Sequence, residues 1–277
     1  MGPGNKGNAP SPADLDELRR ELREAAEPER VPELQRFFKT GLGGYGEGDV
    51  FLGVRVPAVR VVARLHAGLN LEDVTKLLRS PIHEERLAAL VILVRRYGRA
   101  DEQQRQRIYD LYLGNTAHVN GWDLVDVSAP HIVGAHLLVR RGAEQQVLDR
   151  LASSPLMWER RIAIMATFAF VREGDCNETL RLARILLDDE HGLIHKAVGW
   201  MLREVGKRDE ELLVGFLQQH AGDMPRTMLR YAVERLDAPL RAELMAAGRR
   251  RTATVGASGQ GSEPQVSSIG KIKLASG

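Results

Sequence analysis

One segment plan recurs along this chain, and it restricts the fold more than any other feature. Each of four stretches contains the end of one helix, a short polar turn and the start of a second helix. The second helix opens with a polar residue, and an apolar run follows it. These stretches begin at Leu77, Leu151, Leu186 and Phe216. The interval between the first two is about twice the others, and the segment WDLVDVSAPHIVGAHLL fills that gap.

The repeat predicts an array of paired helices. A period of roughly 35–40 residues with two helices in each unit is typical of HEAT-like solenoids. Arg86, Arg161 and Lys196 occupy comparable places in their repeats. We therefore expect an all-α fold, a right-handed solenoid of HEAT-like repeats in which the second helix of each unit lines a concave face.

Composition agrees with packed helices and suggests the domain limits. The 277 residues are 43% hydrophobic but only 5% aromatic, which suits helices better than a β-sandwich. Residues 1–12 and 248–277 are rich in Gly, Pro and Ser and carry almost nothing to bury, so we expect two disordered tails. The repeat domain is expected to span residues 13–247.

Several kinds of protein are disfavoured. The longest apolar run, Ile162 to Val171, is shorter than the roughly 18 residues that span a bilayer, and no apolar signal core begins the chain. One cysteine, Cys176, excludes an internal disulfide framework. GLGGYG follows a helical pattern instead of a strand, so it is interpreted as a loop and not a nucleotide site. We expect a cytoplasmic protein that binds no membrane, nucleotide cofactor or metal.

The net charge of +2 says little about partners, but the charge distribution says more. The segment from residue 76 to 107 is distinctly basic, which favours contact with a polyanion. Solvated helix faces explain the same excess equally well. Its charges are eight bases (Lys76, Arg79, Arg86, Arg95, Arg96, Arg99, Arg105 and Arg107) and four acids (Glu84, Glu85, Asp101 and Glu102).

The stretch HVNGWDLVDVSAP carries the clearest functional signal. Trp122 and Asp126 are four residues apart, so they share one face of a helix, where neither a packed core nor a solvated surface suits both. In a solenoid, the starts of successive inner helices converge, which would bring this pair towards Arg161 and Trp200. Singly, each has a plain alternative: Trp200 in the core, Asp126 as a helix cap, Arg161 paired with a nearby acid.

Taken together, these residues carry a family resemblance. VNGWDLVD, followed by WERRIAIM and IHKAVGWMLRE, is similar to the bacterial DNA alkylation repair glycosylases, the AlkD-like HEAT-repeat enzymes. FLGVRVPAVR, which begins at Phe51, resembles an N-terminal signature of that family. The similarity extends over roughly residues 37–236.

The resemblance implies a monomeric, monofunctional DNA glycosylase of base excision repair, without a cofactor. Its concave face would hold duplex DNA, and it would hydrolyse the N-glycosidic bond of cationic N3- or N7-alkylated purines. Asp126 would be the catalytic carboxylate, with Trp122, Arg161 and Trp200 around it. The further DNA contacts would be Tyr45, Lys196, Arg86 and Arg160, and the spacing leaves open whether Arg160 or Arg161 faces the DNA.

The chemistry suits these residue types independently. An alkylated, cationic purine leaves as a neutral base, so the positive charge that develops on the deoxyribose is what needs stabilisation. An ionised carboxylate can provide it and can orient the attacking water. Two rival hypotheses remain at this stage: a non-catalytic protein that binds distorted or branched DNA, and a protein-interaction scaffold.

Overall fold

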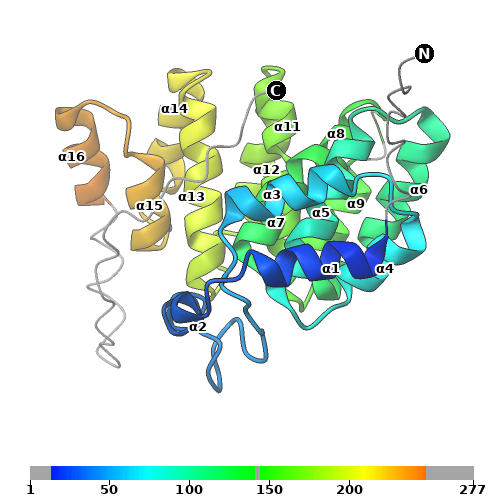
Figure 1. Cartoon of the computed structure of the whole chain (residues 1–277). Coiled ribbons are helices and arrows are strands. Elements are labelled where there is room, and N and C mark those ends of the chain that lie inside the picture. Colours follow the sequence, from blue (N-terminus) through cyan, green and yellow to red (C-terminus); the bar gives the residue numbers. More distant parts are fainter. Residues whose placement is uncertain (1–13, 141, 143, 248–277) are drawn as a thin grey trace, which may run out of the picture. The chain divides into compact units, whose positions relative to one another are not determined.

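The structure, a computed structural model, describes residues 14–140, 142 and 144–247. The two predicted tails, residues 1–12 and 248–277, lie outside these residues. Throughout the described residues the regular elements are helices, and no strand forms (Figure 1). The prediction of an all-α chain is therefore confirmed.

The chain divides into two compact units, the first ending at Leu182 and the second beginning at Ala183. Helix α12 (Asn177–Ile185) crosses the division. The first unit contains α1 (Leu15–Glu24), α2 (Val31–Phe37), α3 (Val56–Leu65), α4 (Leu71–Leu78), α5 (His83–Tyr97), α6 (Glu102–Leu113), α7 (Trp122–Ser128), α8 (Ala135–Leu138), α9 (Glu144–Ala152), α10 (Met157–Ala166) and α11 (Phe168–Arg172).

The second unit contains α13 (Gly192–Gly206), α14 (Glu210–His220), α15 (Arg226–Ala232) and α16 (Ala238–Ala247). Here α13 packs against both α14 and α15. Short elements complete the first unit: two 3₁₀ turns, Pro28–Arg30 and Thr116–His118, and one π-helical turn, Pro130–Gly134. The π turn directly follows α7, because Pro130 has no N–H to continue the α-helical ladder.

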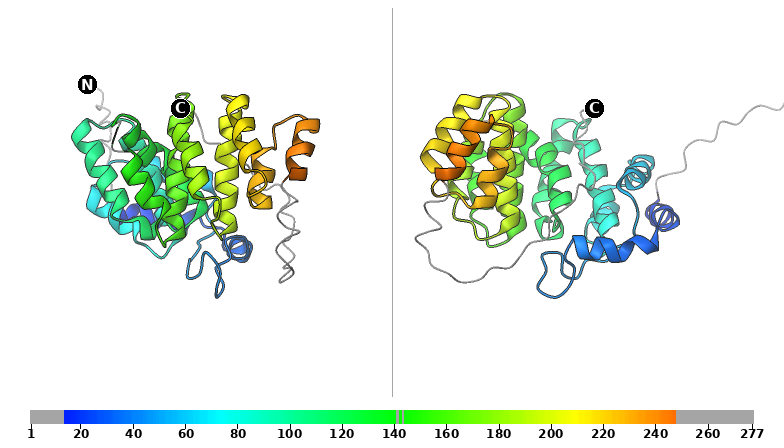
Figure 2. Two further views of the ribbon diagram at one scale, coloured as in Figure 1. Left: turned by 180° about the vertical axis from the view of Figure 1, so that it is seen from behind. Right: turned by 90° about the vertical axis from the view of Figure 1, so that its left-hand side faces the viewer.

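Successive helix pairs build the first unit, as the repeat predicts. Helices α4, α6 and α9 each precede a longer or more buried partner, namely α5, α7 with its π turn, and α10. The second members also contact each other, since α7 packs against both α5 and α10 (Figure 2). This inner row places the beginnings of α5, α7 and α10 side by side.

Local sequence explains where a typical helix begins. At α4, the side chain of Asn70 accepts a hydrogen bond from the backbone N–H of Asp73 at 2.8 Å and so caps the first turn. Acidic residues in that first turn and Lys76 in the last complement the helix dipole. Val74 and Leu77 then face the core, fully buried.

The inner helices hold most of the core. On α5, the residues from Leu87 to Leu90, together with Ile92 and Leu93, are almost completely inaccessible, which is typical of a helix covered on several sides. On α10, residues 162–166 are fully buried. Such packing is what allows polar side chains at the start of the same helices to be held in fixed positions.

Candidate active site

Helix α7 presents Trp122 and Asp126 on one face, as their spacing predicts. Gly121 precedes the helix in an extended conformation and leaves no room for a side chain. A Cβ at Gly121 would lie 2.8 Å from Oδ1 of Asp123 and 3.1 Å from a ring carbon of His83. Trp122 is half-buried, whereas Asp126 is buried. Glycine is therefore what lets α7 begin so close to α5.

Asp126 forms a bidentate ion pair with Arg161 of α10. The guanidinium donates from Nε to Oδ1 at 3.0 Å and from Nη2 to Oδ2 at 2.9 Å. Both residues are buried, although 12% of the Asp126 side chain stays accessible. Burial raises the pKa of the Asp126 carboxyl, and the charge of Arg161 opposes that rise. The structure thus joins two of the four residues that the sequence places at the centre of the site.

Aromatic side chains from the N-terminal segment fix the Trp122 ring. Phe38 stacks on it with ring centroids 5.6 Å apart and planes 9° from parallel, and Phe37 meets it edge-on at 5.8 Å. Phe38 also stacks on Phe51 at 5.1 Å. Trp122 is consequently held from the end of α2, with part of its surface still open.

A buried charge network lies beside this aromatic group. His83, the first residue of α5, places Nδ1 3.0 Å from Asp49 and Nε2 2.8 Å from Asp123. Arg86 lies 2.7 Å from the other oxygen of Asp49. An isolated bridge between Val50 and the residue before His83 aligns the two segments. We call Asp49, His83, Arg86 and Asp123 the His83 network.

The pKa shifts in the His83 network follow from its pairing. Burial acts to lower the pKa of His83, but the charge and hydrogen bond of Asp123 outweigh it and raise the pKa to about 9. Burial acts to raise the pKa of Asp49, but the hydrogen bond from His83 and the charge of Arg86 lower it overall. The side chains of His83 and Asp49 are therefore both charged at neutral pH. The charged His83 also pairs with Asp123, and this contact ties α5 to the start of α7.

The predicted DNA contact Arg86 needs correction. Its side chain is only 3% exposed, and besides Asp49 it binds the carbonyl of Ser80 through Nη1 at 2.9 Å. Arg160 makes the same contact in its own repeat, donating to the carbonyl of Ser154 at 2.9 Å. Arg86 thus corresponds to Arg160 and not to Arg161, and it belongs to the interior because its charge is already compensated there.

The FLGVRVPAVR segment is anchored by Glu84 of α5. This buried carboxylate accepts hydrogen bonds from the backbone N–H groups of Leu52, Gly53 and Val54 at 2.8–3.2 Å. Gly53 has φ +89°, and a Cβ there would lie 2.2 Å from the carbonyl oxygen of Glu27. The glycine and the distant glutamate together hold this segment against the start of α5.

Tyr45 lies in the glycine-rich loop after α2. Its hydroxyl donates to the carbonyl of Phe37 at 2.8 Å, and its ring meets Trp158 edge-on at 6.1 Å. Trp158 is buried, which is typical of a packing residue. Leu42, three residues before Tyr45, is 97% exposed. Tyr45 is half-buried, and its role as a DNA contact stays a prediction.

Trp200 and Lys196 lie on α13 in the second unit. Trp200 is half-buried, and its indole N–H donates to Glu204 at 2.9 Å, so it is not a simple core residue. Lys196 is also half-buried. Their convergence with Asp126 remains a prediction.

Sequence reasoning missed several residues around the site. Their partners are far away along the chain: His83 binds residues 34 and 40 positions away, and Glu84 binds a segment about 30 positions away. The available signals were the FF doublet at the end of α2 and the charged HEER run opening an otherwise apolar helix. The missed residues are Phe37, Phe38, Asp49, His83 and Glu84.

Among the residues that the structure describes, no cluster of three or more His, Cys, Asp or Glu side chains could hold a metal ion. In the same part of the chain, no helix combines the length and the apolar character needed to cross a bilayer.

Comparison with known proteins identifies the family. The sequence profile of the DNA alkylation repair enzymes matches residues 18–236, and the chain belongs to that family. A solved structure described as a predicted DNA alkylation repair enzyme from Enterococcus faecalis has the same fold, with a TM-score of 0.60 and 14% identity. That likeness covers 77% of this chain and 97% of the other. A search of curated proteins gives no match.

Proposed function

We propose that this protein is a monofunctional DNA glycosylase that releases cationic N3- or N7-alkylated purines from duplex DNA. The observation that carries the proposal is the Asp126 carboxylate, held by Arg161 next to the partly open face of Trp122. A buried carboxylate in this setting is unsuited to plain phosphate binding, because it would repel the DNA backbone. It is well suited to stabilise positive charge.

The reaction breaks the bond between C1′ of the deoxyribose and the purine nitrogen. The bonding electrons go to the purine, which departs neutral because alkylation had already made it a cation. Asp126 stabilises the positive charge left on the sugar and orients the water that attacks C1′. The water loses a proton to solvent, and the product is an abasic site in an intact strand.

Arg161 acts in this scheme on the carboxylate instead of on a phosphate. Its two hydrogen bonds fix both oxygens of Asp126 and oppose the rise in pKa that burial causes. It is therefore a positioning residue, in line with the sequence-based alternative that Arg161 pairs with an acid. The accessible part of the Asp126 side chain is the part that would face the sugar.

Other residues would bind the DNA around the lesion. The indole faces of Trp122 and Trp200 can attract the cationic nucleotide, at about 0.5–2 kcal/mol each depending on desolvation. Tyr45 and Lys196 would contact the DNA backbone. Arg160 would act indirectly, because it holds the turn before α10 through the carbonyls of Ser154 and Pro155.

The direct test uses a duplex with a single 7-methylguanine and measures release of the free base. We expect release by the unchanged protein and a loss of at least about 100-fold in Asp126→Asn, in line with the effect of removing one electrostatic stabiliser. Asp110→Asn, which removes an exposed carboxylate of α6, is the matched control and should stay active.

The remaining outcomes separate the rival functions. Salt-dependent DNA binding without release above the spontaneous rate would show a non-catalytic DNA-binding protein, with Asp126 as a structural residue. Absence of DNA binding would favour a protein-interaction scaffold. Strand cleavage at the abasic product would contradict the monofunctional assignment.

A further inference from the structure

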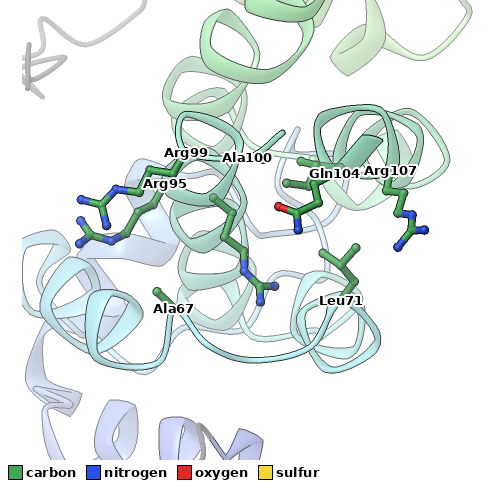
Figure 3. A pocket seen from close by; sticks show the side chains of 9 residues that line it. Ala67, Leu71, Arg95, Arg99, Ala100, Gln104 and Arg107 are labelled. Carbon is green, nitrogen blue, oxygen red and sulfur yellow. The ribbon is translucent and has the colours of Figure 1, made fainter. Parts of the chain in front are cut away.

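A second concave site lies at the far end of α5 from the His83 network. It is a cavity of about 390 Å³ between the end of α5, the start of α6 and the turn that joins α3 to α4 (Figure 3). From His83 to Arg96 the helix rises about 20 Å, at 1.5 Å per residue. The lining residues that matter here are Leu71, Arg95, Arg96, Arg99, Arg107 and Ile108.

The lining is strongly basic and contains no acid. Arg95, near the end of α5, and Arg99, in the turn after it, extend together, whereas Arg107 lies on the α6 side near Leu71 (Figure 3). Within the described residues, the four lining arginines have no ion pair and no hydrogen bond through their guanidinium groups. Elsewhere in the first unit, Arg20, Arg55 and many others pair with carboxylates.

Arg96 shows most clearly that the cavity lacks a counter-charge. Its Nη1 is buried and has no hydrogen-bond partner. Burial also lowers the pKa of its guanidinium, which is the direction expected for a cation without a nearby anion. A buried, unpaired charged donor is unfavourable, so a negatively charged ligand that reached it would gain a partly desolvated ion pair.

We propose that this cavity binds the phosphate groups of a polyanionic ligand. Guanidinium groups match phosphate oxygens with paired donors. Four of them, two on α5, one in the turn after it and one on α6, can bind more than one phosphate. The side chains of Leu71 and Ile108 give the cavity an apolar part, and its volume is in the range of small-ligand sites. The site does not depend on base release at Asp126.

Binding can be measured by titration calorimetry with inorganic tripolyphosphate and the full chain. We expect saturable binding that weakens at least tenfold in Arg96→Gln/Arg107→Gln. The matched control, Arg150→Gln/Arg208→Gln, removes the same charge from exposed positions outside the cavity and should bind as the unchanged protein does. No saturable binding, or an equal loss in the control, would overturn the proposal.

An undamaged duplex distinguishes the source of the phosphates. If the duplex competes with tripolyphosphate, and the cavity variant binds it more weakly with a shallower salt dependence, the site takes phosphates of the DNA backbone. If duplex binding is unchanged while tripolyphosphate binding is lost, the site takes a free phosphate ligand. Either result upholds the site.

A thermal measurement provides a readout that a folding defect would not mimic. Tripolyphosphate should raise the melting temperature of the unchanged protein and of the control, but not that of the cavity variant. Without ligand, the cavity variant should melt no lower than the unchanged protein, because the buried Nη1 donor that it loses at Arg96 has no partner. A lower melting temperature without ligand would show that the arginines serve the fold instead.

Discussion

Asp126 and Arg161 are each the fifth residue of their helix, and their side chains meet where α7 packs against α10. The central ion pair is therefore built from a single repeat position that carries an acid in one repeat and a base in the next. Lys196 is the fifth residue of α13, and Leu87 the fifth of α5. The chemistry of the site arises from variation at this position.

Removing one partner of this pair should harm stability more than removing both. Arg161→Gln leaves the Asp126 carboxylate without its guanidinium, and loss of one partner of a buried pair costs about 3–5 kcal/mol. The double variant Asp126→Asn/Arg161→Gln should be more stable than Arg161→Gln alone. Urea unfolding of both variants checks this. Equal stability of the two variants in urea would mean that an unpaired Asp126 carboxylate costs nothing, which would contradict this prediction.

The rate of base release should depend on the ionisation of Asp126. Because burial raises the pKa of this carboxyl, activity should fall on acidification at a higher pH than the ordinary value of about 3.9 would give. Arg161→Gln removes the opposing charge and should move this acidic limb further upward. Single-turnover rates on 7-methylguanine DNA across pH measure both. An acidic limb that stays in place in Arg161→Gln would contradict this assignment.

The His83 network should make stability depend on alkaline pH. The folded-state pKa of His83 is about 9 and its ordinary value is 6.5, so its contribution is fully present below about pH 6.5. It is lost as the pH rises through 9, and it amounts to about 3 kcal/mol by linkage. Urea unfolding should show this fall in the unchanged protein and in His118→Gln, but not in His83→Gln. The same fall in His83→Gln would assign it to other groups.

Glu84 should govern the order of the segment at Leu52 to Val54. Glu84→Gln replaces a charged acceptor of three backbone N–H groups by an amide, which should destabilise the fold by about 1.5–3 kcal/mol. Hydrogen exchange at residues 52–54 should accelerate as well. Glu173→Gln, an exposed residue directly after α11, is the control and should change neither quantity.

Substitutions of the two tryptophans of the first unit should affect different properties, one the activity and the other the stability. Trp122→Phe should lower base release about tenfold with little effect on stability, because the indole is half-buried and the loss equals about 1.4 kcal/mol of cation–π attraction. Trp158→Phe should destabilise by about 1–2 kcal/mol, because it opens space in the core, and should spare the activity of the folded protein. Melting temperatures and single-turnover rates of both variants test this prediction. If both substitutions change the two quantities to the same extent, the prediction is contradicted.

The helical repeat and part of the site could be predicted because their signals are local. Caps such as Asn70, the i, i+4 spacing of Trp122 and Asp126, and the apolar period of the inner helices depend on a few neighbouring residues. The resemblance to the family then indicated Arg161, 35 residues beyond Asp126.

The supporting residues could not be predicted in the same way. His83 and Glu84 resemble a solvated helix start in sequence, yet both are buried because a segment more than 30 residues earlier covers them. Matching Arg86 to Arg161 because both are basic shifts the register of the repeats by one residue. The serine-to-arginine contact, which Arg86 and Arg160 share, gives the true register.

This register makes the site sensitive to length as well as to side-chain identity. An insertion of one residue between Trp158 and Arg161 would rotate every later side chain of α10 by about 100° and turn the guanidinium away from Asp126. The same insertion in the exposed turn at Ser153 leaves the helix phase intact. We therefore expect descendants of this sequence to vary in length in the turns between repeats. The number of residues from the first to the fifth position of α7 and of α10 should stay the same.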